Sequence, residues 1–169
     1  SFAVTNAANI RSARLFNGTS PIGTVVSVGG TSPIVFTGLT GVIATDNRQL
    51  ALNLRITFNT TETDNQQMQF TVSSVTANTT KSTFAATNGG GAISLTTSDI
   101  NRIEVTADRL SFVTQPVNTS QNTAMTTSPS AKAIDINNNI DLDYSTAIAI
   151  TSTGTMTGAP ISVTPSSGV

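Results

Sequence analysis

The sequence predicts an all-β protein made of two consecutive antiparallel β-sandwich modules, the second of them Ig-like and incomplete. Its composition points to a folded chain, because 37% of the residues are hydrophobic and only 10% are charged, whereas disordered chains combine low hydrophobicity with high charge. Thr and Val are abundant, and β-branched side chains favour strands. No stretch of ten residues shows a helical period with caps.

The clearest strand pattern covers residues 48–59. Large apolar side chains occupy every second position there and alternate with smaller or polar ones: Leu50, Leu52, Leu54, Ile56 and Phe58. This period of two is typical of a strand with one buried face, as in antiparallel sheets. A second run, residues 66–75, repeats the pattern until its phase slips at Ser73 and predicts a bulge or a strand end.

Six further strands are predicted in the first module, which covers residues 1–107. Their ranges are 2–5, 12–16, 23–28, 34–37, 91–95 and 100–107. Turn-forming pairs separate them, among them Asn17-Gly18, Gly29-Gly30 and Asp46-Asn47. About eight short strands at this spacing predict a sandwich.

The second module covers residues 108–169. Asp108-Arg109 is too short to act as a flexible tether, so we expect the two modules to meet at a fixed angle. Strands are predicted at 110–114, 131–136, 144–151 and 161–164. These are too few for a closed sandwich, so we expect the module to continue past Val169 or to borrow strands from a neighbour.

The residue types argue against catalysis. The sequence has neither His nor Cys, which removes imidazole bases and thiolate nucleophiles. Glu62 and Asp64 stand two residues apart and resemble the carboxylate pair of a glycosidase. A solvated loop between strands explains them better, and the sequence predicts that the protein is not an enzyme.

Charge and hydropathy limit the classes of binding partner that the sequence predicts. The net charge is −1 and the basic residues are scattered, so no basic stripe is available for nucleic acid. No apolar run approaches the length that spans a bilayer, so we expect no membrane insertion. Sugar rings stack on Trp and Tyr, and the chain has no Trp and only Tyr144. Sugar binding through Asn, Asp and loop backbone stays open.

One run has the composition of a calcium site. Oxygen-bearing side chains occupy alternate positions, as Ca²⁺ ligands do: Asp135, Asn137, Asn139, Asp141 and Asp143. The run departs from an EF-hand loop, because Ile140 replaces its glycine and Thr146 its bidentate glutamate. In the alternative interpretation, residues 137–139 form a hairpin turn and the flanking aspartates are solvated.

The second module resembles a known family. The phrases that carry the resemblance are Ala-Asp-Arg-Leu-Ser-Phe-Val-Thr-Gln-Pro at 107–116, Ser128-Pro129, Ala-Ile-Asp-Ile-Asn-Asn-Asn at 133–139 and Gly-Thr-Met-Thr-Gly at 154–158. They are similar to the Ig-like repeats of very large secreted surface proteins of Bacteroidetes, which include gliding-motility adhesins exported by type IX secretion. Residues 4–10, 64–70 and 101–107 are similar to the module that often precedes such a repeat.

The resemblance implies a function. The chain would be a non-catalytic structural and adhesive repeat segment of a giant bacterial cell-surface protein, outside the outer membrane. It would hold or form a stalk or filament used in surface attachment or gliding. Its partners would be neighbouring modules of the same chain, surface polysaccharide, or proteins of the surface machinery. The alternative is a polysaccharide- or partner-binding module of a secreted protein, with Ca²⁺ as cofactor.

Overall fold

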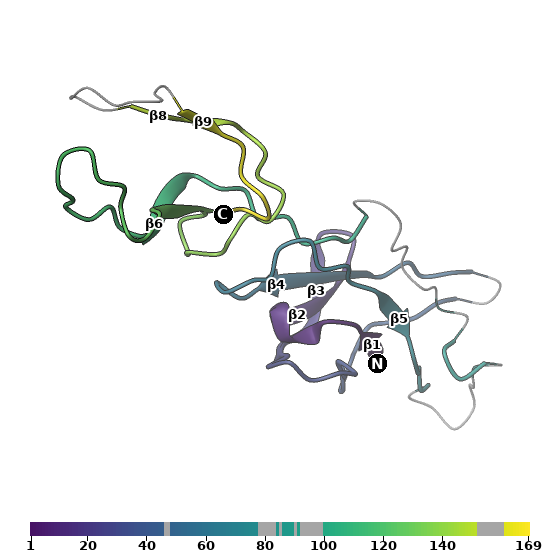
Figure 1. The fold of residues 1–169 in the computed structure, drawn as a ribbon. Coiled ribbons are helices and arrows are strands. Elements are labelled where there is room, and N and C mark those ends of the chain that lie inside the picture. The colour runs from purple at the N-terminus through teal and green to yellow at the C-terminus, as the bar shows by residue number, and fades with distance from the viewer. Residues whose placement is uncertain (46–47, 78–83, 85, 90, 92–99, 152–160) are drawn as a thin grey trace. The chain divides into compact units, whose positions relative to one another are not determined.

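The computed structural model describes residues 1–45, 48–77, 84, 86–89, 91, 100–151 and 161–169 (Figure 1). Every named sheet in this part of the chain is antiparallel, and the only helical element described is the 3₁₀ turn η1, Ala7–Asn9. The all-β, sandwich-like fold class predicted from the sequence is therefore confirmed. None of the described helices is long and apolar enough to cross a membrane.

The chain folds into two compact units. Unit 1 consists of Ser1–Glu62 and Gln66–Ile103, and unit 2 of Thr63–Asn65 and Glu104–Val169. In the structure the main boundary falls between Ile103 and Glu104. The predicted modules 1–107 and 108–169 place it four residues later in the sequence. The sequence also gives no sign that residues 63–65 belong with the second unit.

The described residues of unit 1 form two small sheets. In the first, β2 (Ile10–Asn17) lies between β3 (Ser20–Ser27) and β4 (Asn53–Phe58). The β2–β3 hairpin turns at Gly18, whose φ of 59° suits a residue without a side chain. In the second sheet, β1 (Phe2–Val4) pairs with β5 (Phe70–Val72).

The core of unit 1 is apolar. Its buried members are Val4, Ala7, Ile10, Ala13, Val28, Ile34, Met68 and Ile103. Leu54 and Ile56 of β4 and Phe70 of β5 pack against this cluster, as the period of two in both sequence runs predicts. Phe58 ends the β4 alternation and is 42% exposed.

Several predicted strands are shorter in the structure or form single bridges. Ile34 forms a single bridge with Phe2, and the preceding Pro33 has no N–H to extend the ladder. Arg102 forms a single bridge with Gln67. After Arg102, the N–H groups of Val105 and Ala107 donate to aspartate side chains and not to the carbonyl groups of a neighbouring strand. Residues 46–47 and 92–95, a predicted turn and most of a predicted strand, lie outside the described residues.

The described part of unit 2 contains two antiparallel pairs of strands. β6 (Arg109–Thr114) pairs with β7 (Ser130–Ile134), and β8 (Ile148–Ile150) pairs with β9 (Ile161–Val163). Beside β7, the carbonyl oxygen of Ala133 accepts from the Asp141 N–H and the Ala133 N–H donates to Gly168. This arrangement holds residues 140–141 against β7 and positions the site described next.

Candidate metal centre

Three aspartates from distant parts of the sequence gather in unit 2. Asp64, Asp141 and Asp143 each place a carboxylate oxygen within 4.8 Å of the other two. Asp64 is 3% exposed and Asp141 is 6% exposed, whereas Asp143 is exposed. Two unit charges at such a separation repel by about 3 kcal/mol at an effective dielectric constant of about 20. The group therefore favours a cation as its occupant.

Asp64 is fixed by hydrogen bonds from the backbone. Its Oδ1 accepts from the N–H groups of Asn65 and Val105, at 2.9 and 2.8 Å. Its Oδ2 accepts from the N–H of Leu142 at 2.7 Å and from Nδ2 of Asn65 at 3.1 Å. Because Leu142 lies between the other two aspartates, this carboxylate ties the segment 63–65 to the segment 141–143.

Asp141 has one oxygen in use and one without a partner. Its Oδ2 accepts from the Ala107 N–H at 2.9 Å. Its Oδ1 is buried and has no hydrogen-bond partner among the described residues. A buried acceptor left without a partner costs about 1–3 kcal/mol, and more when it is charged. A metal ion would supply the missing interaction.

The residue after Asp64 offers a neutral oxygen. Oδ1 of Asn65 is buried and has no hydrogen-bond partner in the described structure, while Nδ2 of the same amide donates to Asp64. Asn65 adopts a φ of 63°, in the left-handed region that Asn tolerates better than most residues. Carboxylate and amide oxygens are the hard ligands of Ca²⁺, which takes six to eight of them in flexible geometry.

The predicted calcium residues separate into two groups. Asp141 and Asp143 belong to the carboxylate group with Asp64, but Asp135 does not. Oδ1 of Asp135 accepts from the N–H groups of Asn137 and Asn139, both at 2.8 Å, and its Oδ2 accepts from Nδ2 of Asn139 at 2.9 Å. Asn138 has a φ of 71°. Residues 135–139 thus form the hairpin turn of the alternative interpretation.

The same turn changes the acidity of Asp135. Burial by itself would raise the pKa of this carboxyl, but hydrogen bonds from Asn139 and Asn137 outweigh burial and lower the pKa below its ordinary value. Asp135 is therefore a carboxylate that the turn already satisfies. Asn137 is exposed and Asn139 is buried.

The glycosidase-like pair is divided between the units. Glu62 belongs to unit 1 and Asp64 to unit 2. Burial raises the pKa of the Glu62 carboxyl, although a hydrogen bond from the Asn59 backbone acts in the opposite direction. Asp64 is buried and accepts four hydrogen bonds. Both oxygens of the Asp64 carboxylate are therefore engaged within unit 2.

Gly168 supports the site from the far end of the chain. Its φ is 74°, and a Cβ at this position would overlap the carbonyl oxygen of Asp141 and lie 2.8 Å from Cγ2 of Ile140. Only glycine allows the backbone to approach residues 140–141 so closely.

Sequence reasoning did not place Asp64 or Asn65 with the predicted calcium residues. Asp64 and Leu142, joined by a hydrogen bond, are 78 residues apart, and no local spacing pattern links positions at such a distance. The one signal is the carboxylate at position 64 just after the strongest strand. The solvated loop predicted there is wrong for Asp64, which is 3% exposed.

Comparisons of the chain with protein-family models, with curated proteins and with solved structures gave no match. The class of protein is thus defined by the fold and the site alone. The chain is an all-β protein of two compact units, the second of which buries two of the three carboxylates of its acidic group.

Proposed function

We propose that the chain is a non-catalytic structural and adhesive segment of a bacterial cell-surface protein, and that Ca²⁺ bound by Asp64, Asp141 and Asp143 stabilises its second unit. The observation that carries the proposal is the buried Oδ1 of Asp141, which lacks a hydrogen-bond partner inside a group of three carboxylates. Asn65 Oδ1 and water would complete the coordination.

The arrangement suits a structural ion better than a catalytic one. Asp64 and Asp141 are buried and each is held by a backbone N–H, so their positions are fixed before an ion binds. The ion would join segments far apart in the sequence, and because these segments separate when the chain unfolds, binding would favour the folded state. Extracellular modules bind Ca²⁺ with dissociation constants of about 10⁻⁴–10⁻³ M.

Three observations support the adhesive part of the proposal. The fold is all-β, as in many surface modules; the sequence contains neither His nor Cys; and residues 107–158 resemble adhesin repeats. The protein would act outside the cell, next to neighbouring modules of the same long chain. Its mechanism is mechanical: folded units separate or present an adhesive surface without chemical turnover.

The calcium proposal is tested by thermal unfolding in 10 mM Ca²⁺ and in chelator. We expect Ca²⁺ to raise the melting temperature of the wild type by about 5 °C or more, since saturation well above the dissociation constant contributes about 1.5–3 kcal/mol. Asp141→Asn should lose this response. In chelator it should melt at or above the wild-type temperature, because the substitution removes the charge of a buried carboxylate whose Oδ1 has no hydrogen-bond partner among the described residues.

Asp135→Asn is the matched control, with the same change of charge a few residues away. If the ion binds at the carboxylate group, this variant keeps its response to Ca²⁺. Loss of the response in Asp135→Asn would instead support the alternating set Asp135, Asn137, Asn139, Asp141 and Asp143. A wild type that responds to neither Ca²⁺ nor chelator would contradict both arrangements.

A further inference from the structure

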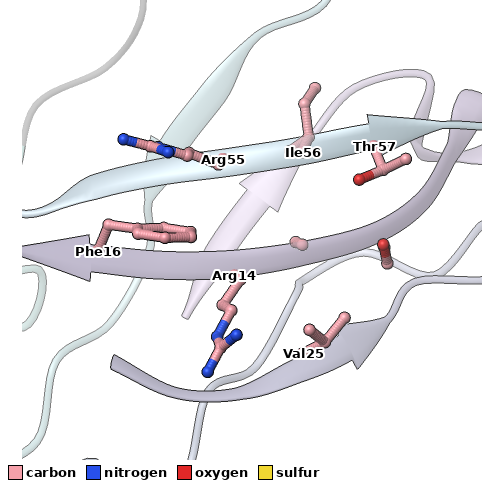
Figure 2. A pocket seen from close by; sticks show the side chains of 8 residues that line it. Arg14, Phe16, Val25, Arg55, Ile56 and Thr57 are labelled. Carbon is pink, nitrogen blue, oxygen red and sulfur yellow. The ribbon is translucent and has the colours of Figure 1, made fainter. Parts of the chain in front are cut away.

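The three-stranded sheet of unit 1 places two arginines directly opposite each other. Arg14 on β2 pairs in register with Arg55 on β4. Like charges at directly opposite positions of a sheet destabilise it. Figure 2 shows both side chains on the sheet beside Phe16, with Arg55 above that ring and Arg14 reaching toward β3.

Among the described residues, the two guanidinium groups have only neutral partners. Arg14 donates from Nε and Nη2 to the carbonyl oxygen of Gly23, at 3.2 and 2.9 Å, and Arg55 donates from Nη2 to that of Gly18 at 3.4 Å. Their Cζ atoms lie 5.9 and 4.2 Å from the centre of the Phe16 ring. Neither forms an ion pair within the described part of the chain, so both charges are uncompensated.

A shallow pocket lies at these residues. Arg14, Phe16, Val25, Arg55 and Thr57 contribute to its lining, and no carboxylate does (Figure 2). Ser12 pairs with Thr57 two residues along the same two strands, so hydroxyl groups accompany the two charges. Ser12, Arg14, Phe16, Arg55 and Thr57 together form one surface, the arginine face.

The charge of the whole unit agrees with this surface. The sequence of unit 1 contains six basic and three acidic residues, a net charge of +3, whereas unit 2 contains two basic and six acidic residues, a net charge of −4. These values add to the −1 of the chain. A near-neutral total thus conceals one unit that attracts anions.

We infer that the arginine face binds the carboxylate or sulfate groups of an acidic polysaccharide. Guanidinium groups bind both anions with paired hydrogen bonds, and the hydroxyls of Ser12 and Thr57 suit sugar hydroxyls. Nucleic acid fits less well, because two arginines neutralise few phosphates and Arg55 already covers the Phe16 ring on which a base would stack. The inference deepens the adhesive part of the proposed function and is independent of the calcium site.

The test measures binding of the full chain to immobilised heparin, polygalacturonate, neutral dextran and single-stranded oligothymidine. We expect binding to the sulfated polymer, the carboxylated polymer or both. Comparing the affinities for heparin and for polygalacturonate shows whether sulfate or carboxylate is preferred. Dextran should not bind. Arg14→Glu should weaken binding at least about tenfold, because a hydrogen-bonded charge is removed and an opposing charge is added.

Arg48→Glu provides the matched control, since it makes the same change of charge at an exposed position of the same unit. It should stay within about twofold of the wild type. Arg14→Glu should also melt at or above the wild-type temperature, because an opposite-charge pair replaces a like-charge pair in the register. A loss of binding therefore does not reflect a loss of folding.

Three results would overturn the inference. If the chain binds neither acidic polysaccharide, the arginine face is not a binding site for them. If Arg14→Glu and Arg48→Glu weaken binding equally, binding results from the net charge of the unit and not from the arginine face. Equally tight binding of oligothymidine would reassign the surface to nucleic acid. Measurement of Asp141→Asn beside the wild type in the same buffer separates this test from the calcium proposal, because binding at unit 1 should be the same for both proteins.

Discussion

The two units of the chain bury different kinds of side chain. Unit 1 encloses eight apolar residues in one cluster, with partly buried aromatic and aliphatic side chains packed around them. In unit 2, the buried apolar residues described are Val105, Ala133 and Ile134, and they are accompanied by the buried polar residues Asp64, Asn139 and Asp141. Leu110 and Phe112 of β6 are 44% and 54% exposed.

This difference separates two sources of stability. Burial of apolar surface contributes roughly 25 cal/mol per Å² and does not depend on protons or ions. Buried carboxylates contribute only as long as their hydrogen bonds and charge partners are in place. We therefore expect unit 1 to respond to changes of side-chain volume, and unit 2 to respond to Ca²⁺, to pH and to the geometry around Asp141.

The largest effect is expected in the core of unit 1. Ile10 is fully buried in β2, and Ile10→Ala should lower the free energy of unfolding by about 3 kcal/mol, from lost burial and the cavity left behind. Urea unfolding followed by circular dichroism measures this change. Ile43→Ala, at a position 72% exposed, should cost less than about 0.5 kcal/mol. Equal costs would mean that the apolar cluster does not hold unit 1 together.

The next effect tests the support of the carboxylate group. Gly168→Ala places a Cβ against the Asp141 carbonyl at a positive φ and should cost about 3 kcal/mol, with a weaker response to Ca²⁺. Gly18→Ala has a similar φ of 59° but nothing within 4 Å of the new Cβ, so it should cost about 1 kcal/mol. Urea unfolding of both variants separates steric overlap from backbone preference. An equal cost would contradict the close packing of Gly168.

The smallest effect is a difference in pH dependence between the units. The pKa of Asp135 is lowered in the folded chain, so its contribution to unit 2 is present above the ordinary value of 3.8 and is lost as pH falls below it. The pKa of Glu62 is raised by burial, so its cost to unit 1 at neutral pH disappears as pH falls toward 4.5.

Amide hydrogen exchange at a series of pH values, corrected for the intrinsic rates, compares the units within one molecule. Asp135→Asn should flatten the acid dependence of unit 2, and Glu62→Gln that of unit 1. If both variants leave the profiles unchanged, these two carboxyl groups do not cause the difference.

The sequence predicted the strands that the structure describes in both units, but not the backbone between Ile103 and β6. The alternation of Leu54 and Ile56, and of Met68 and Phe70, was enough to identify the core faces, because a strand repeats every two residues. The predicted strand 100–107 became mostly irregular, since the N–H groups of Val105 and Ala107 bond to aspartates that local patterns cannot pair with them. When backbone N–H groups bond to side chains and not to a neighbouring strand, the sequence shows no alternation of apolar and polar residues that would reveal it.

The two candidate sites were predictable to different degrees. Asp141 and Asp143 stood out by their alternating oxygens, but Asp64 depends on a contact across 78 residues of chain. The arginine face depends on the register that places Arg14 opposite Arg55. Register between strands separated by a long connection follows from packing of the whole sheet and not from the residues of either strand.

The polar interior of unit 2 is tested most directly by amide exchange in the wild type with and without Ca²⁺. The N–H groups of Val105 and Leu142 donate to Asp64, and that of Ala107 donates to Asp141. We predict that 10 mM Ca²⁺ slows their exchange about tenfold or more relative to chelator, and leaves Val28 and Asn59 of unit 1 unchanged. Equal slowing at all five amides, or none at any of them, would contradict a calcium-stabilised second unit.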